Sequence, residues 1–255
     1  MKGFYRLLNF EFSTMSRALL ILCLGLITTQ AFFINLAMKD YVNIYNRFEV
    51  IYSTSGCIII FLVYFAVLCV YFLKSIYMYY WGSKSIYTLL SLPVKREVVY
   101  FSKLAAFFIT FLSFFAAQLI SVLLSYSIVV SKVSGFEEGK YLMNNGLFLA
   151  FIRSGFLRII LPLTTEGIVS TASIAITIII TIYYGALCER SKRYWGFIFI
   201  AAAVFLIIHI LNYRMSKPVY HLEYKNLYIY SGMLLSLSGF FLWHSIKLVK
   251  TGAIV

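Results

Sequence analysis

Charged residues are scarce in this chain. Of its 255 residues only 12% are charged and 62% are hydrophobic. A chain with so little polar surface cannot cover a water-soluble globule. Its apolar residues instead gather in runs of about 20, the length that a helix needs to cross a bilayer. The scarcity of charge therefore excludes a soluble domain of ordinary size and predicts a membrane protein.

Several catalytic and metal-binding patterns are missing as well. There is no G-x-x-x-x-G-K-[ST] loop to hold ATP phosphates, and no H-E-x-x-H or G-x-S-x-G motif of a hydrolase. No C-x-x-C pair occurs, and the three histidines are scattered. We therefore expect no enzymatic activity, no catalytic residue, no metal and no cofactor on this chain. The four cysteines are expected to act as small buried hydrophobic residues: Cys23, Cys57, Cys69 and Cys188.

Six apolar runs are predicted to be transmembrane helices. Lipid offers no partner for backbone N–H and C=O groups, and the runs are too long and too uniformly apolar for barrel strands. The expected fold is all-α, a polytopic membrane protein with a single transmembrane domain over residues 1–255. The predicted spans are 18–36, 56–80, 104–130, 167–187, 195–213 and 227–248.

The first 17 residues have a helical period of their own. Apolar side chains such as Phe4, Leu8 and Phe12 recur at helical spacing, and Lys2 and Arg6 fall largely on the other side. This pattern is typical of an interfacial helix that lies on the membrane. A disordered basic tail is the alternative.

The distribution of Lys and Arg predicts the orientation. Thirteen of the 22 lie on the side of the two termini if the spans are as predicted, and the short turn 189–193 is strongly basic. We expect a multi-pass protein of the cell membrane with both termini in the cytoplasm. The net charge of +13 then favours contact with anionic lipid, and no nucleic-acid partner is expected.

A long external segment, 131–166, separates the third and fourth spans. Its part from 141 to 163 is apolar but contains Arg153 and Arg158, which favours an external interfacial or re-entrant helix over a seventh span. A seventh span would also place the basic turn 189–193 outside, against the positive-inside tendency.

The loop 81–103, between the second and third spans, is amphipathic. Pro93 fits a turn or the first turn of a helix, so we expect two short helices broken at Leu92-Pro93. Ile86, Leu89 and Leu90 would then project as apolar side chains at the membrane surface. They could dock into a groove of a partner or rest on lipid headgroups.

The segment Tyr87-Thr88-Leu89-Leu90-Ser91-Leu92-Pro93-Val94-Lys95-Arg96, followed by Lys103, resembles the leu-leu-x-leu-pro-x-x-arg signature of type-2 ATP-binding-cassette (ABC) export permeases. In that family it also follows the second of six spans. The resemblance extends to an amphipathic leader ending in an acidic residue, here Glu11, and to the basic turn after the fourth span. Lys84-Ser85-Ile86 departs from the glutamate-and-glycine run of many relatives.

The resemblance implies a cytoplasmic coupling helix that seats in a nucleotide-binding subunit. It also implies two separate ABC ATPase subunits, which carry the ATP and Mg, and a homodimer or a heterodimer with a paralogous permease in the membrane lipid. The chain further resembles exporters of amphipathic toxin or antimicrobial peptides, such as those of phenol-soluble modulins; lipid export and self-immunity stay open. The coupling role falls on Ile86, Tyr87, Leu89, Leu90, Leu92, Pro93 and Arg96.

An ion-coupled secondary transporter is the alternative function. Such proteins bind coupling ions at ionisable residues near the bilayer midplane. Within the predicted spans Lys74 is the one charged residue away from the ends, and it can reach the interface. The paucity of charge favours a conduit that is powered from outside the membrane.

Polar stripes on two spans are candidate pathway linings. Tyr64 and Tyr71 are seven residues apart on the second span, where aromatic rings with a polar tip would suit an amphipathic cargo. The fourth span carries a hydroxyl stripe, which could contact cargo or simply allow close helix packing. That stripe consists of Ser170, Ser173, Thr177 and Thr181.

Overall fold

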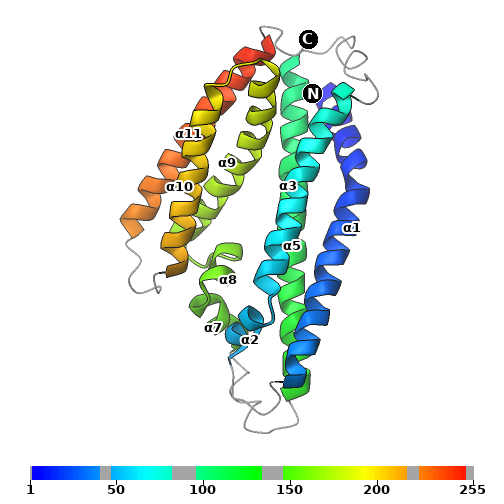
Figure 1. Ribbon diagram of the computed structural model, residues 1–255, viewed down its shortest axis with the longest axis vertical. Helices are drawn as coiled ribbons and strands as arrows, with labels where there is room; N and C mark the ends of the chain where they lie inside the picture. The colour runs from blue at the N-terminus through cyan, green and yellow to red at the C-terminus, as the bar shows by residue number, and fades with distance from the viewer. Residues whose placement is uncertain (1, 41–46, 82–95, 134–145, 217–223, 251–255) are drawn as a thin grey trace.

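The computed structural model describes residues 2–40, 47–81, 96–133, 146–216 and 224–250. All the regular elements in these ranges are helices (Figure 1). They are α1 (Lys2–Asp40), α2 (Phe48–Thr54), α3 (Cys57–Trp81), α5 (Arg96–Val133), α7 (Gly146–Arg153), α8 (Gly155–Ile160), α9 (Thr165–Arg190), α10 (Gly196–Ser216) and α11 (Tyr224–Lys250).

Six of these helices are long and apolar enough to cross a membrane, namely α1, α3, α5, α9, α10 and α11. The all-α fold is therefore confirmed for the described residues, with six candidate membrane-spanning helices. Between α5 and α9 the structure has two short helices, α7 and α8, in place of the one helix expected over 141–163. With eight and six residues, they are too short to span a bilayer. Ser154 separates them and caps α8, since its side chain accepts a hydrogen bond from the Leu157 amide.

The N-terminal leader is the first part of α1 and not a separate element. Helix α1 continues through residues 17 and 18 without a break. Leu7, Glu11 and Met15 are buried, and the Thr110 hydroxyl of α5 lies 3.9 Å from the Met15 sulfur. The leader thus presents its inner face to a neighbouring helix, and the predicted separate interfacial helix is not confirmed.

The spans form two units of three helices (Figure 1). In the first unit α1 packs along α5 and also contacts α3; in the second α9 packs along α11, with α10 beside them. Lys132 contacts Asn35 at the opposite end of the α1–α5 pair from Thr110 and Met15, so these two helices run parallel. The units meet where α9 contacts α3 and α5 and where α11 contacts α5.

Serines allow the close approach of α11 to α9. A buried stripe on α11 alternates steps of four and three residues, the spacing of a helix seam. Small residues at such a seam let helix backbones approach closely in lipid, where apolar burial alone gives little association. The stripe consists of Leu227, Ser231, Leu234, Ser238, Phe241, Ser245 and Leu248.

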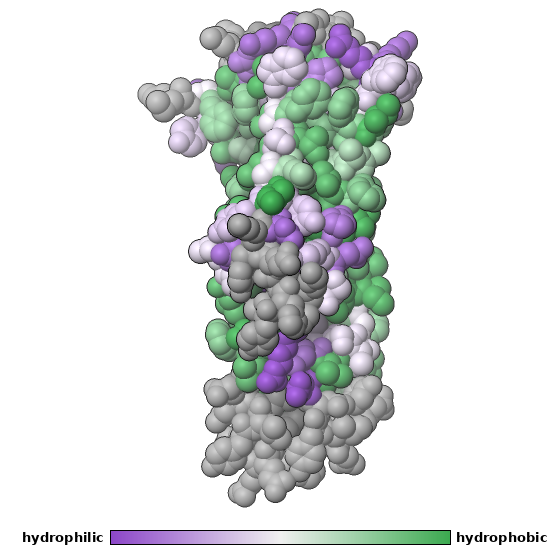
Figure 2. Space-filling model, turned by 90° about the vertical axis from the view of Figure 1, so that its left-hand side faces the viewer, coloured by the Kyte–Doolittle hydropathy of each residue, from purple (hydrophilic) through white to green (hydrophobic). Residues whose placement is uncertain are grey.

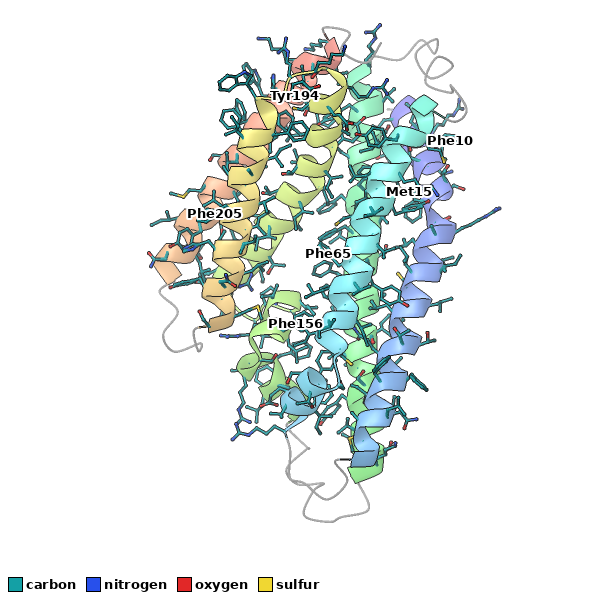
Figure 3. The ribbon with its side chains drawn as sticks, viewed as in Figure 1. Phe10, Met15, Phe65, Phe156, Tyr194 and Phe205 are labelled. Atoms are coloured by element: carbon teal, nitrogen blue, oxygen red, sulfur yellow. The ribbon has the colours of Figure 1, made fainter. Side chains whose placement is uncertain are left out.

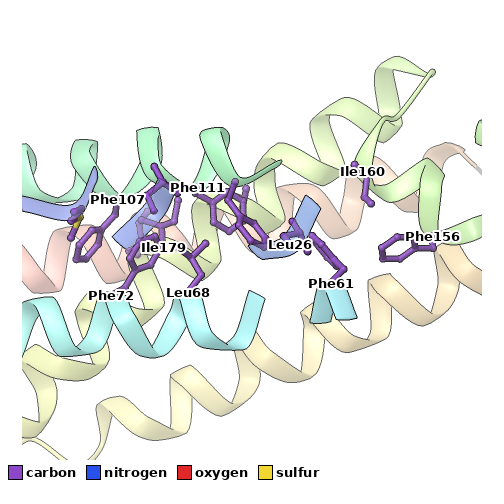
Figure 4. Packing of buried hydrophobic residues seen from close by; sticks show 14 of the residues in the cluster. Leu26, Phe61, Leu68, Phe72, Phe107, Phe111, Phe156, Ile160 and Ile179 are labelled. Carbon is purple, nitrogen blue, oxygen red and sulfur yellow. The ribbon is translucent and has the colours of Figure 1, made fainter. Parts of the chain in front are cut away.

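Aromatic side chains pack between α3 and α5 and between α3 and α8 (Figure 4). Phe72 stacks on Phe107 with ring centroids 4.6 Å apart, and Phe61 contacts Phe156 at 5.4 Å. Figure 3 shows Phe156 directed into the bundle and Phe205 directed away from it. This part of the packing is therefore apolar and aromatic.

The outer surface of the bundle is also apolar. Figure 2 shows a hydrophobic surface on the face of α10 and α11, with hydrophilic residues at its upper rim and in a second band about halfway down the view. Large side chains such as Phe205 and Trp243 are exposed there. Exposed apolar surface on this scale is suited to lipid and costly in water.

The two ends of the bundle differ. Helix α1 begins and α11 ends at the same end, which we call the terminal end (Figure 1). The short helices α2, α7 and α8 lie at the opposite end, which we call the cap end. An ion pair between Glu49 and Arg153, 3.9 Å apart, connects α2 to α7.

Candidate functional site

The loop that carries the predicted coupling residues joins two helices at the terminal end. Helix α3 ends at Trp81 and α5 begins at Arg96, both beside the start of α1 (Figure 1). Arg96 is exposed as the first residue of α5. Because α5 starts there, the last part of the predicted loop, 96–103, belongs to the third span. The other coupling residues, Ile86, Tyr87, Leu89, Leu90, Leu92 and Pro93, lie outside the described residues.

Two polar contacts connect the flanks of this loop to the second unit. Before the loop, the Tyr77 hydroxyl of α3 donates to the carboxylate of Glu189, near the end of α9. After the loop, Lys250 at the end of α11 donates to Glu97 in the first turn of α5, at 2.9 Å. Exposed contacts of this kind contribute about 1 kcal/mol or less to stability. Their position matters more, since each one links an end of the loop to a helix of the other unit.

A buried pair of opposite charges lies near these contacts. Glu11 of α1 and Lys103 of α5 are both almost fully buried, and the Glu11 carboxylate interacts with the Lys103 ammonium. Lys103 also donates to the Ser75 carbonyl of α3 at 3.3 Å. Charges are taken out of water only where such partners compensate them. Sequence reasoning missed this pair because it placed Glu11 in the leader and Lys103 in the loop.

The tyrosines predicted to line a pathway are packed within the first unit. Tyr64 faces α1, since a Cβ atom built on Gly25 would lie only 2.9 Å from the Tyr64 hydroxyl. Tyr71 is half-buried against the central cluster. The described chain therefore gives both rings a packing partner, and contact of either ring with cargo stays a prediction.

The hydroxyl stripe of the fourth span is buried. Thr177 donates to the Ser173 carbonyl at 2.7 Å and lies 3.4 Å from the Leu234 carbonyl of α11. Ser170 accepts from the Arg214 guanidinium of α10 at 3.4 Å. Thr181 is buried as well. This placement is the helix-packing geometry of small polar residues, and a cargo contact is again untested.

At the cap end, three side chains form a closed ring of hydrogen bonds. Gln30 Nε2 donates to Gln118 Oε1 at 3.1 Å, and Gln118 Nε2 donates to the Tyr52 hydroxyl at 2.7 Å. The Tyr52 hydroxyl in turn donates to Gln30 Oε1 at 3.1 Å. All three bonds run in the same direction, an arrangement in which each bond polarises the next.

Two neighbouring groups make further hydrogen bonds to Gln30. The Ser121 hydroxyl donates to Gln30 Oε1 at 2.7 Å, and Gln30 Nε2 also donates to the Cys57 carbonyl at 3.2 Å. Burial, together with the nearby Cys57, raises the pKa of Tyr52, so its hydroxyl stays protonated and can donate. Each of the four helices α1, α2, α3 and α5 therefore contributes to one buried network.

Only part of this network could be anticipated from local sequence. Gln118 and Ser121 fall on one polar face of the third span, and polar residues inside spans commonly have a role. Tyr52 and Gln30 carry no such signal by themselves, because nothing local shows that α2 folds back onto α1.

No metal site accompanies these features: among the described residues, no group of three or more His, Cys, Asp or Glu side chains could hold a metal ion. No family model, curated protein or solved structure matches this chain.

Proposed function

We propose that this chain is the transmembrane permease subunit of an ABC exporter. The observation that carries the proposal is the amphipathic loop Leu89-Leu90-Ser91-Leu92-Pro93, placed by the sequence between the second and third of six apolar helices. Helix α3 ends and α5 begins at the terminal end, where α1 begins and α11 ends. In the proposed orientation, the terminal end faces the cytoplasm.

The proposed engine is a pair of separate ATPase subunits, since the sequence has no phosphate-binding loop of its own. Closure of these subunits on ATP and Mg would press on the loop between Trp81 and Arg96. The contacts of Tyr77 with Glu189 and of Glu97 with Lys250 would carry that displacement to α9 and α11. Small shifts of packed helices of this kind are an established form of switching.

The proposed pathway needs a second copy of this chain or a paralogue, because six spans make half of such an exporter in the resembled family. The proposed cargo is an amphipathic peptide. Its support is the family resemblance together with the aromatic content of 19%, which provides rings for contact with an apolar face.

The first experiment is purification of the tagged protein from its native membrane in mild detergent. The double substitution Leu89→Asp and Leu90→Asp should leave the protein inserted but release the ATPase subunit, which otherwise co-purifies. A matched control is Tyr194→Asp with Trp195→Asp, two exposed side chains in the turn between α9 and α10 at the same end. Equal ATPase recovery from the loop variant and the wild type would contradict the coupling assignment.

The orientation has a separate test. In a cysteine-free background, Arg153→Cys places a thiol at an exposed position of the cap end, and Lys192→Cys places one in the basic turn. Impermeant thiol reagents added to intact cells should label position 153 and leave position 192 unlabelled. The reverse pattern would invert the topology.

An ion-coupled transporter is a second candidate because of one observation, the buried pair of Glu11 and Lys103. Ionisable residues inside a membrane bundle are common parts of proton and ion pathways. If no ATPase co-purifies in several detergents, Glu11→Gln in proteoliposomes with an imposed proton gradient tests this function. Loss of gradient-driven transport in Glu11→Gln, compared with the wild type, would favour the ion-coupled function.

A further inference from the structure

Helix α2 is joined to α3 by a short turn of special geometry. Gly56, between the last residue of α2 and the first of α3, has a φ of +76°. This left-handed conformation is readily adopted by glycine and strained for other residues. No atom lies within 4 Å of the position that a Gly56 Cβ would occupy. The turn therefore has both the backbone freedom and the space to act as a hinge.

Only one face of α2 is held by the bundle. Phe48, Ile51 and Tyr52 are buried, whereas Val50 and Thr54 are exposed. Phe48 packs on Tyr126 of α5 with centroids 5.3 Å apart. This face is small, as expected for a helix of seven residues, so a few contacts decide whether α2 stays in place.

Tyr52 is the one residue of α2 in the hydrogen-bonded ring. If α2 moved away, Gln30 and Gln118 could keep the bond between them, which comes from α1 and α5. Gln30 Oε1 would also keep the bond from the Ser121 hydroxyl. Gln118 Nε2 would lose its acceptor and Gln30 Oε1 one of its two donors, and both positions would turn to water. Water occupies a buried position when it finds two to four polar partners there. An apolar position would stay dry, so these side chains lower the cost of the open state.

The closed state is stabilised by the same groups. With Tyr52 in place, each of them has a protein partner at 2.7 to 3.1 Å. A helix whose polar neighbours find hydrogen-bond partners in both the closed and the open state can switch between the two. A helix whose departure left those groups unpaired could not do so at low cost. Glu49 adds a long ion pair, 3.9 Å, to Arg153 of α7.

We infer that α2 is a lid on the cap end of the bundle, hinged at Gly56 and latched by Tyr52 to Gln30 and Gln118. Its role as the far gate of a transport pathway rests on the proposed permease function. The hinge and the latch are properties of this chain alone and can be tested without any partner.

Native cysteines report on the latch. The Cys57 thiol is fully buried beside the hinge, 3.2 Å from the Ser55 hydroxyl and 3.8 Å from the Gln30 carbonyl. Cys188, near the terminal end of α9, is buried to the same degree. Reaction of Cys57 therefore measures opening at the cap end, and reaction of Cys188 measures loosening elsewhere.

The test uses the full chain with Cys23→Ala and Cys69→Ala, purified in detergent and treated with N-ethylmaleimide. Tyr52→Phe removes one hydroxyl and keeps the ring. We expect Cys57 to react about tenfold faster in this variant, the factor that corresponds to about 1.4 kcal/mol, with the rate of Cys188 unchanged. Tyr64→Phe, which removes a hydroxyl from α3 outside the ring, is the matched control and should alter neither rate.

Two results would overturn the lid: an unchanged Cys57 rate in Tyr52→Phe, or equal acceleration of Cys57 and Cys188, which would indicate general loosening. If Tyr52→Phe does not fold, Gln118→Leu removes one of the two latch bonds of Tyr52, and the same comparison should show selective acceleration of Cys57. The assay contains no ATPase. Failure of the latch thus leaves the permease proposal standing, and a pull-down without ATPase leaves the latch standing.

Discussion

Arg158 and Arg214 each donate a hydrogen bond to the backbone carbonyl of the other. Nη2 of Arg158 lies 3.2 Å from the Arg214 oxygen, and Nη2 of Arg214 lies 3.0 Å from the Arg158 oxygen. Both carbonyls belong to the last turn of a helix, where intrahelical partners run out. Arg214 also donates to the Thr171 hydroxyl of α9 at 2.9 Å. The exchange thereby connects α8, α9 and α10, although the two guanidinium charges repel each other.

Arg214→Ala should destabilise the protein by about 2 kcal/mol or more, because it removes hydrogen bonds of a charged, buried group. Arg153→Ala should cost less than about 1 kcal/mol, since the Arg153 side of its 3.9 Å ion pair is exposed. The unfolding midpoints of both variants in the same detergent give the comparison. Equal midpoints would show that the exchange between Arg158 and Arg214 adds nothing beyond a surface contact.

Gln118→Leu should cost about 1 to 3 kcal/mol, since it leaves groups of Gln30 and Tyr52 buried without their partner. Thermal unfolding in detergent measures this cost, and Ser113→Ala at an exposed position of α5 is the control. Adding Gln30→Leu removes both partners of the bond between Gln30 and Gln118. The double variant should therefore lose less stability than the sum of the losses in the two single variants. Simple additivity would contradict a coupled ring.

Ser238→Leu should destabilise the pair of α9 and α11, because a large side chain at the buried seam forces the helices apart. Ser236→Leu makes the same change two residues away, at an exposed position of α11. The expected loss is about 1 to 3 kcal/mol at position 238 and close to none at position 236. Similar melting temperatures for the two variants would place the seam elsewhere on α11.

Gly25→Ala should destabilise the contact of α1 with α3, since the new methyl group would lie 2.9 Å from the Tyr64 hydroxyl. Tyr64→Phe removes that oxygen, so the double variant should recover part of the loss. Gly239→Ala is the control, because no atom lies near its Cβ position. Unfolding midpoints of the four proteins test the idea, and a double variant no more stable than Gly25→Ala would rule out the clash.

Features that depend on local chemistry were predictable. A run of apolar residues must become a helix in lipid whatever its neighbours are, so the six spans were found from their length alone. The leader shows the limit of such reasoning. Its apolar stripe was correctly assigned to a helix, but the stripe does not reveal whether lipid or another helix covers it. In the structure, Leu7 and Met15 are buried, and Met15 contacts Thr110 of α5.

The sequence by itself determined that this chain is a helical membrane protein with an amphipathic loop after its second span, because run length, charge scarcity and a contiguous motif are local properties. Tertiary structure alone decided which polar groups meet. Gln30 and Gln118 are 88 positions apart, and Glu11 and Lys103 lie on different helices. Their pairing depends on the direction in which each helix runs and on the face that it turns toward its neighbour. No local pattern encodes those two quantities, since they follow from the packing of all the helices at once.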